Sequence, residues 1–377
     1  MIEDELRERF GTVATPPSRL RVDELVAGGR RTARRRRALQ AAGGAALAVG
    51  VLVAVPSFVW GGTRAAPVAG TGAVVRCEAA KLPVPAGLTQ VELQAVDPGG
   101  RYVIGNDVRV STGTTDAGKP DRIGTSQPVL WTDGSPTALP KGGKKSVYAA
   151  GVNASGTVIA MGGDDTAWDT VLRYTAGVPT ELRLPAGDWS VRMFPSINAA
   201  GDVVATVGPV GSVVVGGTVL LWKAGSTEPT RLPLPAGAQS RRLGDDGRIF
   251  GFMSDGASSW AWDQRGTGTR LDAPAGQTAT LSTARGDYAT GTLSPSGEVG
   301  RWNVRTGEFR RIPINAPVDS VNGQGWLIID SAVYRTDADV ELAAVDGVAG
   351  SARDLSDTGA VVGTAGTNVP VRWTCAD

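Results

Sequence analysis

A short sequence pattern is repeated seven times after residue 90, and this repetition restricts the fold more than any other feature. Each copy begins with a tight polar turn that closes on Gly and continues through alternating apolar runs, a later one of which ends in an aromatic residue. The segment from Ile197 to Gly237 contains every part of the pattern. Successive copies are spaced by roughly 32 to 56 residues, the range of four-stranded propeller blades.

Two residue types mark the copies and alternate strictly along the chain. Gly closes each turn because a tight hairpin often needs a positive φ, and the aromatic residue is large enough to fill the wedge between neighbouring sheets. The glycines are Gly100, Gly156, Gly201, Gly247, Gly286, Gly325 and Gly359, and the aromatics are Trp131, Tyr174, Trp222, Trp262, Trp302, Tyr334 and Trp373. The pattern predicts an all-β fold, a seven-bladed β-propeller with four-stranded blades, over residues 77–377.

The ends of the repeat region predict how the ring closes. Only four residues follow Trp373, so the last copy lacks its Leu-Pro run, whereas Lys81 to Gly87 near the front closely matches Arg231 to Gly237. We therefore expect the N-terminal strand to complete the last blade, which leaves no unpaired edge in the ring.

The two cysteines flank this predicted closure. Cys77 precedes the borrowed strand and Cys375 follows the last aromatic residue, so a disulfide between them is predicted to clasp the ring. The chain-entropy model gives roughly 5 kcal/mol for so long a loop. The alternative is two unrelated buried thiols.

The N-terminal part predicts a membrane anchor. Residues 1–37 form a polar, basic tail, residues 38–60 carry no charge over a length that spans a bilayer, and the small residues of 61–76 suit a linker. The positive-inside rule places the tail in the cytoplasm and the propeller outside the cell. A nucleic-acid patch and a cleaved signal peptide are the alternatives. The topology signal is the cluster Arg30, Arg31, Arg34, Arg35, Arg36 and Arg37.

Charge and composition exclude several functions. The tail holds 10 of the 38 Lys plus Arg and 6 of the 37 Asp plus Glu, which leaves 28 against 31 elsewhere and no strong field for nucleic acid. The chain contains no His, which excludes Ser-His-Asp and Cys-His catalysis and His-ligated zinc. We expect no catalytic residues and no cofactor.

One loop in the second copy is the best candidate for a ligand site. Asp164, Asp165, Trp168 and Asp169 lie between two predicted strands, and Trp189 lies in a connection on the same face. Oxygen ligands suit calcium and aromatic faces suit sugar rings, so this group is a candidate calcium or sugar site. The alternative is a solvated loop with a packed Trp. Arg285 to Asp287 spells an adhesion tripeptide, but it occupies a repeat-turn position and is interpreted as a hairpin.

Two resemblances accompany these patterns. The turn and strand of Ile197 to Val204, followed by Val219 to Trp222, resemble the HAF-type repeats of extracellular bacterial propellers; the similarity to WD-repeats is weaker, because only Trp262-Asp263 matches their signature. This resemblance implies a fold and no activity. The leader, Arg run and Ala/Val span are similar to those of actinobacterial membrane regulators, some of which work beside sigma factors, although the His/Cys zinc pattern of one such family is absent.

Together these features predict a single-pass membrane protein that carries a non-catalytic binding or sensing platform at the cell surface. Its expected partner is an envelope protein or a glycan. One alternative is a signalling regulator whose residues 1–37 engage a sigma factor. The other is a carboxylate-based glycosidase or lyase.

Overall fold

A computed structural model describes residues 74–109, 125–164, 167–210, 217–256, 258–336, 339–366 and 369–375. The predicted tail and membrane span, residues 1–37 and 38–60, lie outside these ranges. Within them the chain forms strands, turns and loops, and it contains no helix that is long and apolar enough to cross a bilayer.

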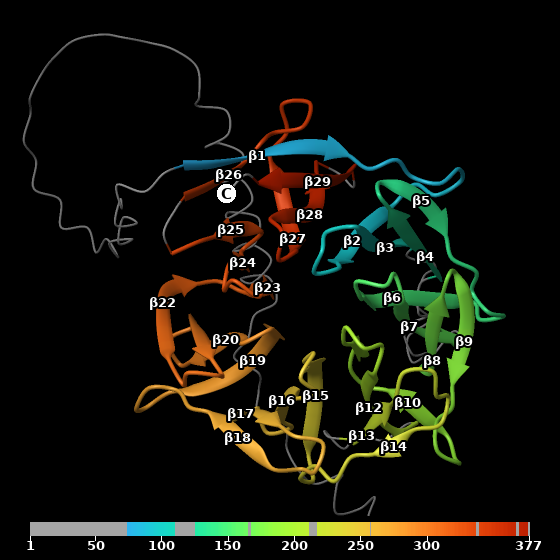
Figure 1. Ribbon diagram of the computed structural model, residues 1–377, viewed down its shortest axis with the longest axis vertical. Coiled ribbons are helices and arrows are strands. Elements are labelled where there is room, and N and C mark those ends of the chain that lie inside the picture. The colour runs from blue at the N-terminus through green and yellow to red at the C-terminus, as the bar shows by residue number, and fades with distance from the viewer. Residues whose placement is uncertain are drawn as a thin grey trace, which may run out of the picture. The chain divides into compact units, whose positions relative to one another are not determined.

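The described strands form seven radial blades around a central channel, which confirms the predicted fold class (Figure 1). Blades one to three comprise β2 (Val91–Val96), β3 (Tyr102–Arg109), β4 (Thr125–Thr132), β5 (Ser135–Ala138); β6 (Ser146–Val152), β7 (Val158–Asp164), β8 (Ala167–Thr175), β9 (Val178–Leu182); and β10 (Trp189–Val191) with β11 (Ser196–Ile197), β12 (Val203–Pro209), β13 (Thr218–Trp222), β14 (Thr230–Arg231).

The next three blades follow the same order from the channel outward. They comprise β15 (Ala238–Leu243), β16 (Ile249–Met253), β17 (Ser259–Trp262), β18 (Gly268–Leu271); β19 (Thr278–Arg285), β20 (Tyr288–Ser294), β21 (Glu298–Asn303), β22 (Phe309–Asn315); and β23 (Val318–Val321), β24 (Leu327–Ile329), β25 (Ala332–Tyr334), β26 (Asp339–Leu342). Blade seven joins β27 (Gly350–Leu355), β28 (Ala360–Ala365) and β29 (Val369–Cys375) to the N-terminal β1 (Val74–Lys81).

In five of the seven blades, the repeated aromatic residue forms a hydrogen bond to the blade before it. Trp131 of blade one is fully buried, and its indole Nε1–H donates to the Pro83 carbonyl just after β1, at 2.7 Å. Trp222 of blade three donates in the same way to the Arg183 carbonyl after β9, at 3.1 Å. Equivalent bonds run from Tyr174 to Pro140, from Trp302 to Asp272 and from Trp373 to Ala343. Each of these aromatic side chains thus fills the space between two sheets, and its N–H or O–H group finds a hydrogen-bond acceptor there.

The repeated turn glycines have the backbone conformation that the sequence predicts. All seven have a positive φ, from 56° at Gly286 to 88° at Gly201. The turns also contact one another around one end of the channel. The Asn153 side-chain amide donates to the Asn198 carbonyl at 3.2 Å, and the Asn322 amide donates to the Ser356 carbonyl at 3.0 Å. These inter-blade bonds explain the polar residues at the start of each repeat.

Strand β1 closes the ring, as predicted, but its position differs from the expected one. It spans Val74–Lys81, so it ends where the Lys81 to Gly87 segment begins. The Leu-Pro segments follow the outermost strands instead of forming them: the Leu82 amide donates to the Pro370 carbonyl, as the Leu232 amide donates to the Val219 carbonyl. The physical reason is that Pro lacks the N–H that a continued ladder needs.

Strand β1 also makes a contact that the repeat pattern did not predict. Besides its antiparallel pairing with β29, it pairs in parallel with β26, the outermost strand of blade six. Blades six and seven therefore form one eight-stranded sheet across the closure (Figure 1). The Cys77–Cys375 disulfide joins two residues that face each other in the β1–β29 ladder, which confirms the predicted clasp.

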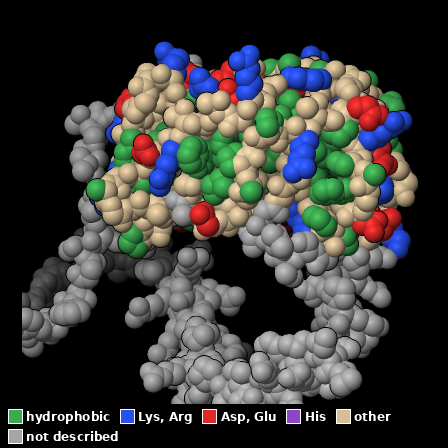
Figure 2. All heavy atoms as spheres, turned by 90° about the horizontal axis from the view of Figure 1, so that it is seen from below, with side chains coloured by type: hydrophobic (Ala, Val, Ile, Leu, Met, Phe, Trp, Pro, Cys, Tyr) green, Lys and Arg blue, Asp and Glu red, His purple; other side chains and the backbone are tan. Residues whose placement is uncertain are grey.

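The outer rim has no dominant charge. On the face seen in Figure 2, Lys and Arg side chains alternate with Asp and Glu, and hydrophobic side chains lie between them. Rim pairs such as Arg183–Glu228 and Arg305–Asp287 are exposed. Exposed ion pairs contribute at most about 1 kcal/mol each, so the blade cores, not the rim, hold the domain together.

Candidate functional site

The channel has two chemically different mouths. The innermost strand of each blade starts at the mouth that carries the connections between blades and between the second and third strands, which we call the loop face. It ends at the mouth that carries the repeated Gly turns, which we call the turn face. The described residues of the predicted ligand site lie at the loop-face ends of strands and not in loops: Asp164 ends β7, Trp168 and Asp169 belong to β8, and Trp189 begins β10.

The innermost strands share an irregularity of strand pairing. In six blades the pairing with the second strand shifts by one residue at the same position, which is a β-bulge, and in blade three the strand is split into β10 and β11 instead. Bulges redirect side chains and are frequent beside functional sites. The extra residues are Gln94, Ala150, Arg241, Ser282, Asp319 and Arg353.

The larger cavity opens at the loop face and has a volume of about 310 Å³. Three of the bulge residues line it: Gln94, Asp319 and Arg353, together with Glu92 and Tyr148. Its remaining lining residues are Leu93, Ser331, Ser351, Ala352, Gly363 and Thr364. The cavity thus combines both signs of charge with hydrogen-bonding groups and one aromatic ring.

Two of the charged groups in this cavity form a pair. Arg353 Nη1 donates to Asp319 Oδ1 at 3.1 Å. Burial raises the pKa of Asp319, and Asp330 raises it further, although the charge of Arg353 opposes the shift. A carboxyl group with a raised pKa in a cavity is typical of functional sites.

An aromatic cluster stands beside the same cavity. The Tyr148 ring stacks on Phe194, with centroids 5.3 Å apart and planes 23° apart, and it meets Trp168 edge-on at 6.5 Å. The Tyr148 hydroxyl donates to Gln94 Oε1 at 2.9 Å, and burial raises its pKa. Phe194 lies where the innermost strand of blade three is interrupted, and 39% of its surface is exposed. The three rings come from blades two and three and form one surface.

The structure distributes the sequence-predicted residues unevenly. Trp168 and Trp189 both pack against the core between blades two and three. Trp168 also meets the Tyr148 ring, whereas Trp189 donates its Nε1–H to the Ala186 carbonyl. Asp164 accepts the Lys145 amide, and Asp169 lies 3.6 Å from the Lys144 ammonium. Asp165 lies outside the described residues.

The predicted calcium site stays a prediction. Among the described residues no group of three Asp, Glu, Cys or His side chains is placed to hold a metal ion. Asp165, the third carboxylate of the predicted set, is not among them.

Sequence reasoning did not find Tyr148, Phe194, Asp319 or Arg353. Tyr148 and Phe194 are 46 positions apart in the sequence, and only the ring brings them together. The interruption of the third blade's innermost strand at Met193 to Pro195 was the available signal, because this copy lacks a regular run there.

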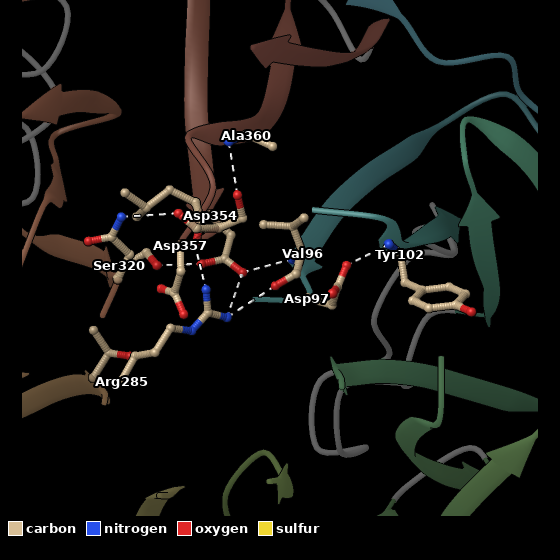
Figure 3. A network of polar contacts seen from close by, with 12 residues as sticks. Val96, Asp97, Tyr102, Arg285, Ser320, Asp354, Asp357 and Ala360 are labelled. Atoms are coloured by element: carbon tan, nitrogen blue, oxygen red, sulfur yellow. Dashed lines mark hydrogen bonds and ion pairs between the residues drawn. The ribbon is translucent and has the colours of Figure 1, made fainter. Parts of the chain in front are cut away.

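The turn face is closed by a side chain that spans the channel. Arg285 of blade five donates through Nη1 to the Leu355 carbonyl of blade seven, at 2.5 Å, and through Nη2 to the Val96 carbonyl of blade one, at 3.0 Å (Figure 3). Its guanidinium also lies 3.9 Å from Asp354. Arg285 lies in the fifth repeat turn, whose sequence departs from the pattern of the other turns. The departure places an arginine where it can bond to blades one and seven.

Solved structures with the same architecture support the class assignment. The chain is similar to a virginiamycin B lyase from Staphylococcus aureus (TM-score 0.52, 14% identity, 80% of this chain and 99% of that chain covered). It is also similar to an oligogalacturonate lyase from Vibrio parahaemolyticus (TM-score 0.51, 10% identity, 81% and 98% covered). A chain of the mitotic checkpoint complex is similar as well (TM-score 0.51, 14% identity, 89% and 100% covered).

These similarities define the protein as a seven-bladed β-propeller. No protein-family model matches the chain, and no curated protein matches it in sequence. At identities of 10 to 14%, the solved structures share a fold with this chain, and their activities do not transfer with it.

Proposed function

We propose that this propeller is a binding protein that holds a carbohydrate at the loop-face mouth of its channel. The observation that supports the proposal is the exposed stack of Phe194 on Tyr148 beside a polar cavity of about 310 Å³. A ligand pocket typically starts at about 300 Å³ and combines aromatic surface with a few fixed polar groups.

The chemistry of the cavity fits a sugar ring. The apolar face of a sugar packs on an aromatic ring, while its hydroxyl groups need both donors and acceptors at the edge. Phe194 and Trp168 provide aromatic surface, and Glu92, Gln94 and Arg353 provide acceptors and donors at the cavity wall. The hydrogen bond from Arg353 to Asp319 fixes the Arg353 guanidinium in place.

A glycan array probed with the full-length protein in detergent tests the proposal. We expect binding to a subset of oligosaccharides and a loss of at least tenfold in affinity for Phe194→Ala. Val178→Ala is the matched control, because Val178 is also an exposed apolar residue but begins β9, next to the β8–β9 turn and away from the loop face. Absence of glycan binding, or wild-type affinity in Phe194→Ala, would contradict the proposal.

We also propose that residues 38–60 anchor the propeller to a membrane, with residues 1–37 in the cytoplasm. The uncharged span and the flanking arginines support this topology. Crosslinking from native membranes, with and without Met1 to Arg31, tests whether the tail also signals. If a cytoplasmic regulator is recovered only when the tail is present, the result supports a signalling role beside a sigma factor. If the same partners are recovered without the tail, the N-terminal region serves only as a membrane anchor.

A carboxylate-based lyase or glycosidase is the second candidate, and Asp319 is the observation that favours it. Its carboxyl group lies in the same cavity as Glu92, and burial raises its pKa. A general acid needs such a shift. Turnover of a bound oligosaccharide by the wild type, abolished in Asp319→Asn with binding retained, would establish this activity; binding without turnover would exclude it.

A further inference from the structure

The innermost strand of blade four brings two adjacent arginines to the channel. Arg241 is the extra residue of the bulge in β15, and Arg242 follows it and lines a cavity of about 80 Å³ at the turn face. Both side chains are only partly accessible, and burial lowers the pKa of both, to about 10 for Arg242. Both remain cations at neutral pH.

Neither cation makes an ion pair with a carboxylate among the described residues, although the charge of Asp354 acts on Arg242 and raises its pKa. Arg242 Nε donates to the Thr283 hydroxyl at 3.1 Å, and its guanidinium makes no ion pair there. The Arg241 guanidinium makes no hydrogen bond or ion pair with the described part of the chain, and its Nε is fully buried. A buried charge without a partner is costly, so this arrangement needs a compensating group.

The acidic groups nearby are already engaged. Asp354 accepts the Val96 amide at 2.8 Å and a hydrogen bond from the Ser320 hydroxyl, and it lies 3.9 Å from Arg285. Asp319 pairs with Arg353, and Asp245 accepts the Ala199 amide at 2.7 Å. Burial lowers the pKa of Arg242 most; the charge of Asp354 opposes this shift, and the charges of the neighbouring arginines add to it.

We propose that the turn-face end of the channel binds an oxyanion, a carboxylate or a phosphate, at Arg242, with Arg241 adding to its attraction. Charge-assisted hydrogen bonds from a guanidinium to such a group are short and strong, and the planar fork matches its geometry. The cavity of about 80 Å³ is well below the roughly 300 Å³ of the smallest typical ligand pockets, so it fits one small group. The anion is either free in solution or the end of a larger ligand.

This site lies at the opposite mouth of the channel from the aromatic cluster, so it is independent of the proposed carbohydrate site. Asn153 and Asn198 also line its cavity. Their amides donate to turn carbonyls, and their side-chain oxygens accept backbone amides, so they fix the shape of the cavity. Asp245 and Asp354 also line it and each accepts a backbone amide, which leaves Arg242 as its available donor.

Thermal unfolding of the full-length protein in detergent tests the proposal, with inorganic phosphate, acetate and chloride compared at equal ionic strength. We expect saturating phosphate or acetate to raise the Tm by roughly 2–4 °C over chloride. Phosphate alone would identify a phosphate site, and acetate alone a carboxylate site. Equal Tm values in all three salts would overturn the proposal.

Two variants locate the effect. Arg242→Gln should remove the anion-dependent rise, and its Tm in chloride should equal or exceed that of the wild type, because an uncompensated buried charge is gone. Arg310→Gln is the matched control, since Arg310 is exposed on β22, and it should keep the full rise. An anion-dependent rise that persists in Arg242→Gln would contradict the proposed site. Glycan binding by Arg242→Gln should equal that of the wild type, because the proposed carbohydrate site lies at the loop face. This measurement therefore tests the carbohydrate site separately from the anion site.

Discussion

Cys77 and Cys375 face each other across the β1–β29 ladder and are joined by a disulfide that spans 298 positions of the chain. The bond therefore encloses all seven blades. Because β1 is the strand that closes the ring, the disulfide and the strand pairing secure the same joint.

Removal of this clasp should destabilise the domain. Cys77→Ser combined with Cys375→Ser is expected to lower the free energy of unfolding by up to about 5 kcal/mol, chiefly because the unfolded chain gains freedom. Urea unfolding followed by tryptophan fluorescence measures the change. The native-state spectrum should be retained, because β1 keeps its ladders with β29 and β26. Equal urea midpoints for variant and wild type would show that strand pairing alone secures the ring.

The seven aromatic residues predict a second stability effect. Trp131 is fully buried and bonds to the Pro83 carbonyl after β1, so it joins blade one to the closure. Trp131→Ala should cost about 3–5 kcal/mol, and Trp131→Phe about 1–2 kcal/mol, because only the second keeps the ring. Trp260→Ala is the control, since Trp260 is half-buried and donates locally to Ser258. In chemical denaturation, Trp260→Ala should be clearly more stable than Trp131→Ala. The reverse order would contradict the prediction that Trp131 stabilises the ring by filling the space between two blades.

The parts of the fold that were predictable are those that each repeat encodes locally. A turn glycine needs its positive φ whatever the neighbouring blade contains, and Trp222 or Trp373 fills a wedge of constant shape. The disulfide was predictable because closure of a ring brings its two ends together. The start of β1 at Val74 was missed because the Leu-Pro segment was taken for the strand that it follows.

The candidate sites were largely unpredictable for the opposite reason. Tyr148 meets Phe194, and Arg285 reaches Val96, only because blades distant in sequence converge on one channel. The bulges at Arg241 and Arg353 are shifts of register, and a shift of register depends on two paired strands. Trp168 was the one member of the aromatic cluster that the sequence identified, although it lies in β8 and not in the predicted loop.

Arg285 should couple three blades, and its substitution tests this. The side chain of blade five bonds to Leu355 of blade seven and Val96 of blade one. Arg285→Gln is expected to lower the free energy of unfolding by about 2 kcal/mol, because two charge-assisted bonds are lost and buried carbonyls stay unpaired. Arg285→Lys should retain only part of the lost stability, because a single ammonium cannot donate to both carbonyls as the planar guanidinium does. Full stability of the Gln variant by urea titration would show that the turn ring needs no bridge.

Asp107 should make stability depend on acid pH. Its buried carboxylate accepts the Gln90 amide at 2.7 Å and the Thr89 amide at 3.0 Å, and it lies 3.0 Å from Arg109 Nε. Burial alone would raise the pKa of Asp107, but the two backbone bonds and the arginine together lower it below the ordinary value of 3.8. The ionised form is thus favoured in the folded state.

The sign of the effect follows from this lowered pKa. The stabilisation is fully present above the unfolded pKa of 3.8, and it is lost as the pH falls below that value through the folded pKa. Asp107→Asn should therefore be less stable by about 1–3 kcal/mol at pH 6, and the difference from wild type should shrink towards pH 2. Urea midpoints measured from pH 2 to pH 6 give the comparison, with the exposed Asp188→Asn as the control. A pH-independent gap between Asp107→Asn and wild type would mean that the side chain acts by shape and not by charge.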